Sequence, residues 1–243
     1  MYLSRLILNP KSREVRRDLA NCHEMHRTLL RAFTEVPAGV SDPRSYFEVL
    51  YRVETDRKTG LPRVYIQSAC LPDWSRLPES YFADVAENPA SKPVLRQYEE
   101  LQVGTVLSFV LKANPTRKVG TKLKCEKGLN REGKNGHRVC LYKPEEQMKW
   151  LTRKAEQNGF ELLSVKINPK VPDLIASPPE DVHGWRKSGT APFMETDKLT
   201  FGSVSFYGHL RIKDKEKFLS GVKSGIGSGK AYGFGMLSLA AAR

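Results

Sequence analysis

Two histidines, His23 and His26, stand among arginines near the N-terminus, and side chains of these types together can move protons beside a phosphate. An imidazole with its reference pKa of about 6.5 accepts or donates a proton at neutral pH. In RNA the natural target is the 2′-hydroxyl beside the scissile phosphate. Once deprotonated, it attacks that phosphate and gives a 2′,3′-cyclic phosphate and a 5′-hydroxyl, with no metal required. Arg27 and Arg31 would stabilise the added negative charge in the transition state.

The spacing around these residues predicts the helix that positions them. Asn21 and Glu24 have the spacing of a capping box, so we expect a helix to begin at Cys22. His23 and Arg27 are four residues apart and then share one face of that helix. Because a helix N-terminus disfavours an imidazolium, a neutral imidazole is predicted close to phosphate-binding cations.

A second interpretation of His26 is structural. One continuous helix over residues 14–33 would place His26 on a buried stripe, as an ordinary core histidine. The stripe has a 4-3-4-3-4 spacing and consists of Val15, Leu19, Cys22, His26, Leu29 and Phe33. Periodicity alone leaves both interpretations open.

Residues 221–235 carry six glycines together with two lysines and two serines. Glycine allows left-handed backbone angles and close approach of a ligand, and exposed N–H groups beside ammonium groups suit phosphate binding. The run is not a Walker A loop, since Ser224 takes the place of the first glycine and Ala231 that of the Ser or Thr that would hold magnesium. A glycine-rich connector between a helix and a final strand is the alternative. The candidate phosphate-binding residues of the run are Lys223, Ser224, Gly225, Gly227, Ser228, Gly229 and Lys230.

Residues 112–138 form the most basic segment, with nine basic and two acidic residues. The whole chain carries 40 Lys and Arg against 27 Asp and Glu, a net charge of +13 that indicates a polyanionic partner. The segment is either a loop that contacts RNA or a solvated linker, and one segment can be both. Its candidate contacts are Lys112, Arg117, Lys118, Lys122, Lys124 and Arg138.

Composition also argues against a membrane protein, a secreted protein and a metal-binding protein. No apolar run approaches the roughly 18–20 residues that span a membrane, and Arg5 and Asn9-Pro10 interrupt the first apolar segment, so we expect neither membrane partner nor signal peptide. Cys125, His137 and Cys140 fit no common zinc finger, and we expect no metal or cofactor. Since the cysteines form no C-x-x-C pair, reduced thiols in a cytoplasmic protein are predicted for Cys22, Cys70, Cys125 and Cys140.

The order of predicted elements indicates an α+β protein with two tandem ferredoxin-like (βαββαβ) domains. In the N-terminal half we expect strands at 2–8, 47–53, 64–66 and 104–111, with helical segments to about residue 33 and over 79–100. In the C-terminal half we expect strands at 139–142, 160–165, 204–212 and 234–239, with helices after Pro144 and Asp214. Residues 168–196 receive no assignment. The predicted division is a catalytic domain at 1–116, a basic linker at 117–138 and a second domain at 139–243.

Four segments occur together and in order along nearly the full chain: Leu8-Asn9-Pro10; residues 18–21 leading into Glu24-Met25-His26-Arg27-Thr28-Leu29; Lys112-Ala113-Asn114-Pro115; and residues 225–238. In this combination the chain resembles the CasE family, the CRISPR precursor-RNA endoribonucleases of the Cascade type within the RAMP superfamily. The resemblance implies two ferredoxin-like domains, metal-independent cleavage at the base of the repeat hairpin, retention of the product RNA, and assembly with other Cascade subunits.

The resemblance also implies site residues. The family's catalytic histidine falls on His26. A tyrosine often stands where this chain has His23, so the second acid or base is His23, a tyrosine elsewhere, or absent. Arg27 and Arg31 match basic positions near the cleavage site, and the glycine run matches a terminal loop that holds RNA. Arg186 and Lys187 fall where the family places a basic hairpin that contacts the RNA stem. The alternative function is an inert RNA-binding scaffold of the same fold.

Overall fold

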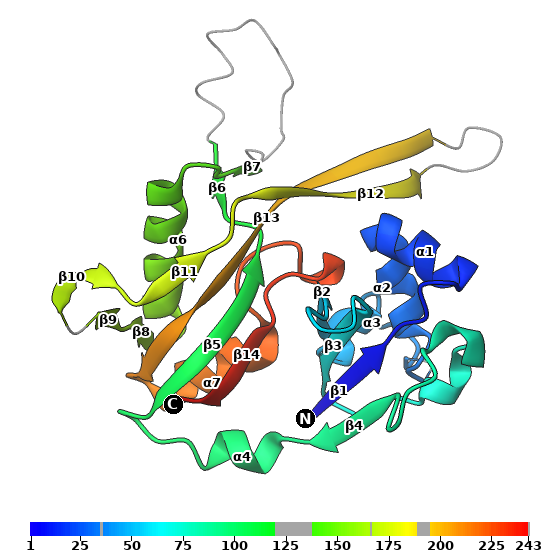
Figure 1. The fold of residues 1–243 in the computed structure, drawn as a ribbon, viewed down its shortest axis with the longest axis horizontal. Helices are drawn as coiled ribbons and strands as arrows, with labels where there is room; N and C mark the ends of the chain where they lie inside the picture. The colour runs from blue at the N-terminus through cyan, green and yellow to red at the C-terminus, as the bar shows by residue number, and fades with distance from the viewer. Residues whose placement is uncertain (35, 120–137, 166, 189–194, 243) are drawn as a thin grey trace, which may run out of the picture.

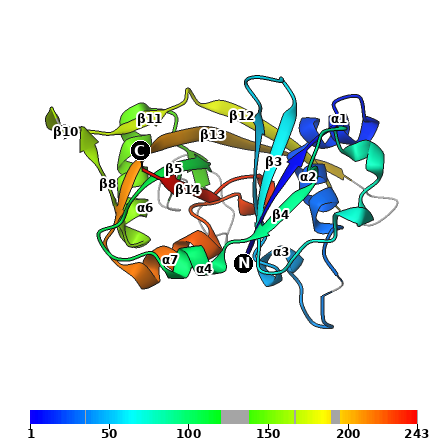
Figure 2. The same ribbon diagram turned by 60° about the horizontal axis from the view of Figure 1, so that its bottom comes forward.

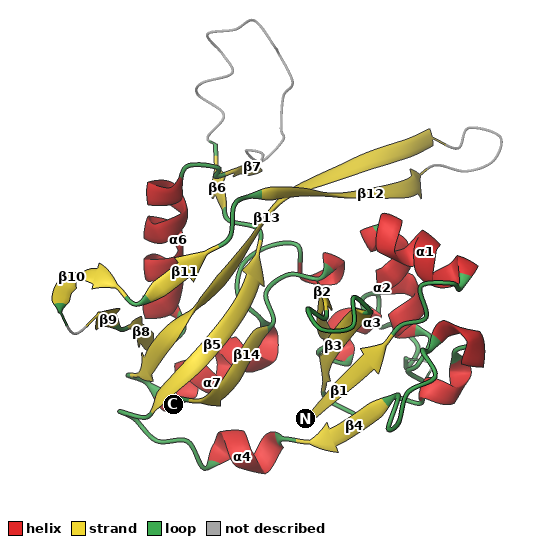
Figure 3. Ribbon diagram, viewed as in Figure 1, coloured by secondary structure: helices red, strands yellow, loops and turns green. Residues whose placement is uncertain are grey.

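The computed structural model describes residues 1–34, 36–119, 138–165, 167–188 and 195–242. Two antiparallel sheets lie side by side, each with helices against it (Figures 1 and 3). The first sheet has the strand order β2-β3-β1-β4, which is that of a ferredoxin-like βαββαβ unit. Its strands are β1 (Tyr2–Ile7), β2 (Leu50–Thr55), β3 (Pro62–Ser68) and β4 (Ala90–Pro93).

The first sheet buries the face that carries alternate apolar residues. Leu6, Val64 and Ile66 are fully buried, and Met25 and Leu29 from the helical layer belong to the same core. That layer consists of α1 (Arg13–Ala20), α2 (Cys22–Leu30) and the short α3 (Pro43–Tyr46). Between β3 and β4 the chain forms only two short 3₁₀ turns, η1 (Trp74–Arg76) and η2 (Glu79–Tyr81), so the helix expected over 79–100 is wrong, apart from α4 (Leu95–Glu99).

The second sheet is a further ferredoxin-like unit. Strand β5 lies between β14, which is at one edge, and β13, while β8, β11 and β12 each pair with β13. Helices α6 and α7 pack on it through Trp150, Leu151, Phe218 and Val222, which share a core with Phe206. The elements are β5 (Val106–Ala113), α6 (Pro144–Gln157), β8 (Phe160–Leu162), β11 (Leu174–Ala176), β12 (Glu180–Ser188), β13 (Glu195–Ile212), α7 (Lys215–Ser224) and β14 (Leu237–Ala241).

Two strand predictions are corrected by the pairing. The strand expected at 104–111 belongs to the second sheet, since β5 pairs with β13 and β14, and the division between the sheets falls before residue 106 rather than at 116. The strand expected at 139–142 does not open the second sheet. It is β7 (Arg138–Cys140), which pairs with β6 (Thr116–Lys118) in a separate two-stranded ribbon. Lys122 and Lys124 lie outside the described residues.

A long hairpin leaves the second sheet and reaches the helices of the first. It pairs β12 with the first half of β13, from Glu180 opposite Ser203 to Ser188 opposite Glu195. In both views the hairpin extends to α2 (Figures 1 and 2). The remaining strands, β9 (Ser164–Val165) and β10 (Asn168–Pro172), pair with each other. Where it is described, the stretch without a predicted assignment, 168–196, is therefore mostly strand.

Candidate functional site

The helix that carries both histidines begins where the capping-box spacing predicts. Asn21 has an extended backbone and ends α1, and its side-chain Oδ1 accepts a hydrogen bond of 3.1 Å from the backbone N–H of His23. The buried residues of α2 are Cys22, Met25, Thr28 and Leu29, whereas His26 is half-buried. The continuous helix over 14–33 is therefore wrong, and His26 is not a sealed core residue.

Both imidazoles are neutral at physiological pH. Burial lowers the pKa of His26 to about 4, and the nearby His23 and Arg44 add to this effect. Burial also lowers the pKa of His23, with further contributions from the charges of Arg27 and Arg186. A neutral imidazole has a free ring nitrogen that accepts a proton, so His26 has the protonation state of a general base.

An aromatic residue of the glycine run, Tyr232, lies beside the two histidines. Tyr232 ends η3 (Lys230–Tyr232), and its ring centroid lies 6.3 Å from that of His23 and 6.4 Å from that of His26. On β13, Phe201 stacks on Tyr232 at 4.8 Å. Two chain segments about 200 residues apart in sequence thus meet at one cluster of rings.

Left-handed glycines and a buried phenol fix this turn in place. Gly229 and Gly233 flank η3 with φ of 76° and 86°, a conformation that L side chains rarely adopt. A Cβ on Gly233 would lie 3.1 Å from the ring of Tyr51. The Tyr51 hydroxyl lies 3.2 Å from the carbonyl oxygen of Cys22 and 3.3 Å from that of Ala231. Tyr51 therefore connects the first residue of α2 to the glycine run.

The cations near the histidines differ from those expected. Arg27 donates to Glu24 at 3.1 Å, and Arg31 to Glu14 at 3.4 Å, so carboxylates partly neutralise both. Arg44 on α3 was not identified from the sequence. Its side chain is only 16% exposed. Burial lowers the pKa of both His26 and Lys230, and the charge of Arg44 adds to the effect on each. No local pattern marks Arg44, because only the fold brings it close to α2.

The hairpin is fastened to the start of α2 by the same Asn21. Its Nδ2 donates to the carbonyl of Trp185 at 3.2 Å, and its Oδ1 accepts from the backbone N–H of Trp185 at 3.0 Å. A Cβ on the neighbouring Gly184 would lie 2.8 Å from the sulfur of Cys22. This attachment brings Arg186 close enough to His23 to lower its pKa, while Arg186 also donates to Asp197 at 3.2 Å.

Replacing Asn21 with alanine should loosen the hairpin and destabilise the helix together. Loss of the N-cap typically costs about 1 kcal/mol, which equilibrium urea unfolding would measure. The amide of Trp185 should also exchange with deuterium faster than in the native protein, because its acceptor is gone. A matched cap variant, Asp214→Ala at the start of α7, removes a cap bond to Lys217 without touching the hairpin. An unchanged rate of amide exchange at Trp185 in Asn21→Ala would show that Asn21 does not hold the hairpin against α2.

Three of the other predicted RNA contacts lie together on the β6–β7 ribbon. Arg117, Lys118 and Arg138 are exposed on the β6–β7 ribbon. Arg138 donates to the Thr116 hydroxyl at 3.3 Å, and that hydroxyl lies 3.2 Å from the hydroxyl of Ser228, so the ribbon adjoins the glycine run.

The remaining predicted RNA contacts lie on other elements of the fold. Lys112 on β5 is half-buried, and burial lowers its pKa. Lys223 and Ser224 end α7, next to Gly225 with φ of 79°, and Gly227 has φ of 91°. Lys187 lies on β12 opposite Thr196.

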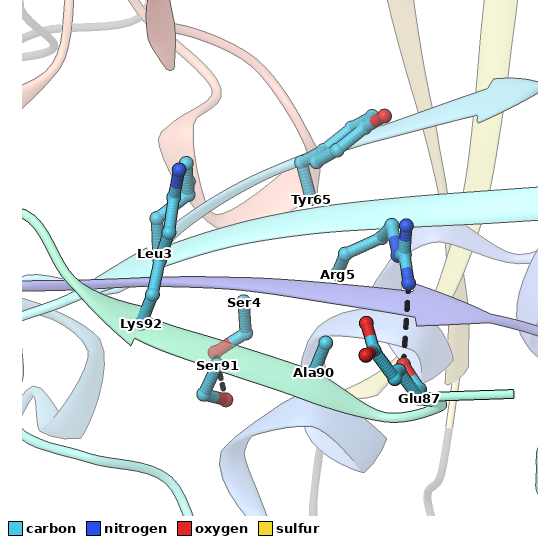
Figure 4. Close-up of a pocket in the computed structure, with 8 residues that line it drawn as sticks. All are labelled: Leu3, Ser4, Arg5, Tyr65, Glu87, Ala90, Ser91 and Lys92. Atoms are coloured by element: carbon cyan, nitrogen blue, oxygen red, sulfur yellow. Dashed lines mark hydrogen bonds between the residues drawn. The ribbon is translucent and has the colours of Figure 1, made fainter.

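A hollow of about 360 Å³ on the first sheet is separate from this site (Figure 4). It is lined by residues of β1, β3 and β4 and of the turn before β4, including Arg5, Tyr65 and Lys92, and by none of the predicted site residues. Within the described ranges there is no group of three or more His, Cys, Asp or Glu side chains placed to hold a metal. In the same part of the chain, no helix is both long and apolar enough to cross a membrane. Three described cysteines, Cys22, Cys70 and Cys140, are free.

Comparison with known proteins identifies the family to which this chain is similar. A family model described as "CRISPR associated protein" matches residues 1–241. The chain is 36% identical to the CRISPR-associated endoribonuclease Cse3 of Thermus thermophilus, over 99% of this chain and all of the relative. It is 31% identical to the CRISPR system Cascade subunit CasE of Escherichia coli, over 99% of each. A solved structure of CRISPR endoribonuclease Cse3 bound to a 19-nucleotide RNA superposes with a TM-score of 0.77, at 33% identity and with 99% of this chain and all of that chain covered.

The match extends over both sheets, the histidine-bearing helix and the glycine run, and the expected resemblance is confirmed. The chain belongs to this family of CRISPR-associated proteins.

Proposed function

We propose that this chain is an endoribonuclease that cuts CRISPR precursor RNA at the base of the repeat hairpin and keeps the product bound. The observation that carries the proposal is His26, a half-buried and neutral imidazole on a helix to which the glycine run and the basic hairpin are both attached. The relative Cse3 is an endoribonuclease in name, and its RNA-bound structure superposes on this chain.

The chemistry is a transesterification that needs no metal. His26 takes the proton of the 2′-hydroxyl, the 2′-oxygen forms a bond to phosphorus, and the bond from phosphorus to the 5′-oxygen breaks. The products are a 2′,3′-cyclic phosphate and a 5′-hydroxyl. Cations near the imidazoles would stabilise the negative charge that grows on the phosphate. We assign this role to Arg44 and Arg27, whose charges add to burial in lowering the pKa values of His26 and His23, and to Lys230, which begins η3.

Binding uses shape and charge. Double-stranded RNA is recognised mostly through its backbone, which suits cations spread over several elements. Arg186 on the hairpin, the exposed cations of the β6–β7 ribbon and the glycine run would contact phosphates of the stem. Because the relative CasE is a Cascade subunit, the proposal includes assembly with other Cascade subunits around the retained RNA. It also includes a cytoplasmic location, in keeping with the free cysteines.

The direct test uses a labelled hairpin with the repeat sequence of the host CRISPR array, incubated with the protein in EDTA. We expect one cut at the base of the stem and a cyclic-phosphate end that resists alkaline phosphatase until acid opens it. A protein that binds the hairpin but leaves it whole under these conditions, with and without added Mg²⁺, would be an inert scaffold. Cleavage only with Mg²⁺ would contradict the mechanism.

The low pKa of His26 predicts an unusual pH profile. The free base is the active form, so the rate is lost as pH falls through the pKa. The acidic limb of kcat/KM reports the free enzyme and should lie near pH 4, well below the ordinary value for histidine. RNA phosphates favour the imidazolium, so the limb of kcat should lie at higher pH. Because the product stays bound, single-turnover cleavage from pH 3.5 to 8 checks both. With the protein in excess over RNA, rates at subsaturating and saturating protein give the equivalents of kcat/KM and kcat, and hairpin binding is measured at each pH. A kcat/KM limb near 6.5 would contradict the buried neutral state.

A further inference from the structure

The ring of Tyr232 adjoins both imidazoles, and the cleavage mechanism has so far given it no task. Its centroid lies 6.3 Å from that of His23 and 6.4 Å from that of His26, with ring planes inclined at 42° and 58°. Phe201 stacks on Tyr232, and the left-handed Gly229 and Gly233 fix the turn that carries it. The position of this phenol is therefore set by the backbone and by an aromatic neighbour.

The chemistry of the cut requires a second group besides the base. The attacking 2′-oxygen and the leaving 5′-oxygen lie on opposite sides of phosphorus, roughly in line. Each proton transfer needs its own group within hydrogen-bond reach of its own oxygen. Proton acceptor and proton donor are thus two side chains several ångströms apart. His26 fills the first position, and the second requires a group that still carries a proton at neutral pH.

The neighbouring groups differ in their ability to give that proton. Burial lowers the pKa of His23 as well as that of His26, so neither imidazole carries a spare proton at neutral pH. A guanidinium such as that of Arg44 keeps its protons throughout and stabilises charge only. Phenols as a class are protonated at neutral pH and act as general acids in enzymes.

We propose that Tyr232 is the general acid of this site, a role that rests on the proposed cleavage function. As His26 accepts the proton of the 2′-hydroxyl and the new bond to phosphorus forms, the Tyr232 hydroxyl gives its proton to the 5′-oxygen while the bond from phosphorus breaks. The cut leaves an imidazolium and a phenolate, and proton exchange with water restores both.

A change of leaving group tests this role. In a repeat hairpin with sulfur in place of the bridging 5′-oxygen at the cut, the leaving group is a thiolate. Thiols ionise near pH ~8.5, so a thiolate departs without a proton from the enzyme. Single-turnover cleavage of the oxygen and sulfur hairpins would be measured for native protein, Tyr232→Phe, His26→Ala and, as a matched control, Tyr207→Phe, whose exposed ring lies elsewhere on β13. Affinity would be measured with a hairpin that lacks the 2′-hydroxyl at the cut.

We expect Tyr232→Phe to slow cleavage of the oxygen hairpin by about 10²–10⁴-fold, and to cut the sulfur hairpin within about tenfold of the native rate. His26→Ala should be slow on both substrates, since the 2′-hydroxyl still needs a base, and Tyr207→Phe should behave as native. Equal slowing of Tyr232→Phe on both hairpins, with normal affinity, would overturn the acid role. A native rate on the oxygen hairpin would overturn it as well. Native protein that cuts neither hairpin would instead overturn the proposed function.

Discussion

Replacing His26 with alanine should slow cleavage of the repeat hairpin by about 10²–10⁴-fold and leave hairpin affinity within a few-fold. The general base is lost, whereas the hairpin strands, the β6–β7 ribbon and the glycine run remain. The imidazole is half-buried and neutral, so its loss removes little binding charge. Single-turnover rates and titrations with a hairpin lacking the 2′-hydroxyl separate the two effects.

A matched control is available on the second sheet. His209 on β13 pairs with Asp173 at 2.7 Å, and His209→Ala should cut at the native rate. Urea unfolding of both variants shows whether a slow rate reflects a folding defect. Cutting at the native rate by folded His26→Ala would remove this residue from the mechanism.

The features that the sequence predicted well are local. The start of α2 follows from Asn21 and the residues just after it, because an N-cap is decided within one turn. The start of α7 after the cap Asp214 and the final strand after the glycine run likewise follow from neighbouring residues. The choice between the two roles of His26 was not decided by periodicity, since a helix break of one residue changes which positions face the core.

What could not be predicted depends on contacts between distant segments. The alternation of β5 fits the edge of the first sheet as well as the middle of the second, and only pairing with β13 and β14 decides between them. Arg44 and Tyr232 carry no local signal, because each reaches the histidines from another element. The second role of Asn21, as the anchor of Trp185, spans 164 residues and is equally invisible in sequence.

Affinity for the hairpin should fall steeply with salt, the second large effect. Each phosphate that a cation neutralises releases bound counterions, so the logarithm of the affinity falls linearly with the logarithm of the salt concentration. With about 6–10 phosphates neutralised, as a chain of net charge +13 can support, affinity should drop by about 10³–10⁵ between 50 and 200 mM salt. Titrations of the hairpin lacking the 2′-hydroxyl at several KCl concentrations give the slope of log affinity against log salt concentration. A slope near zero would contradict binding through phosphate contacts.

The salt dependence of affinity in variants that lack particular cations shows which part of the surface binds RNA. Changing Arg117, Lys118 and Arg138 together to glutamine should make the slope shallower by about one for each phosphate that these side chains no longer neutralise, because all three are exposed on one ribbon beside the glycine run. Arg96→Gln is the control. The Arg96 side chain on α4 is 91% exposed and pairs with Glu100 just after the helix, so this variant lowers the net charge without touching the ribbon. If charge acted only through the net value, the slope would change in proportion to the charges removed in both variants. A slope that changes only with the ribbon variant would locate the RNA stem on this ribbon, where the neighbouring glycine run leads to His26 and Tyr232.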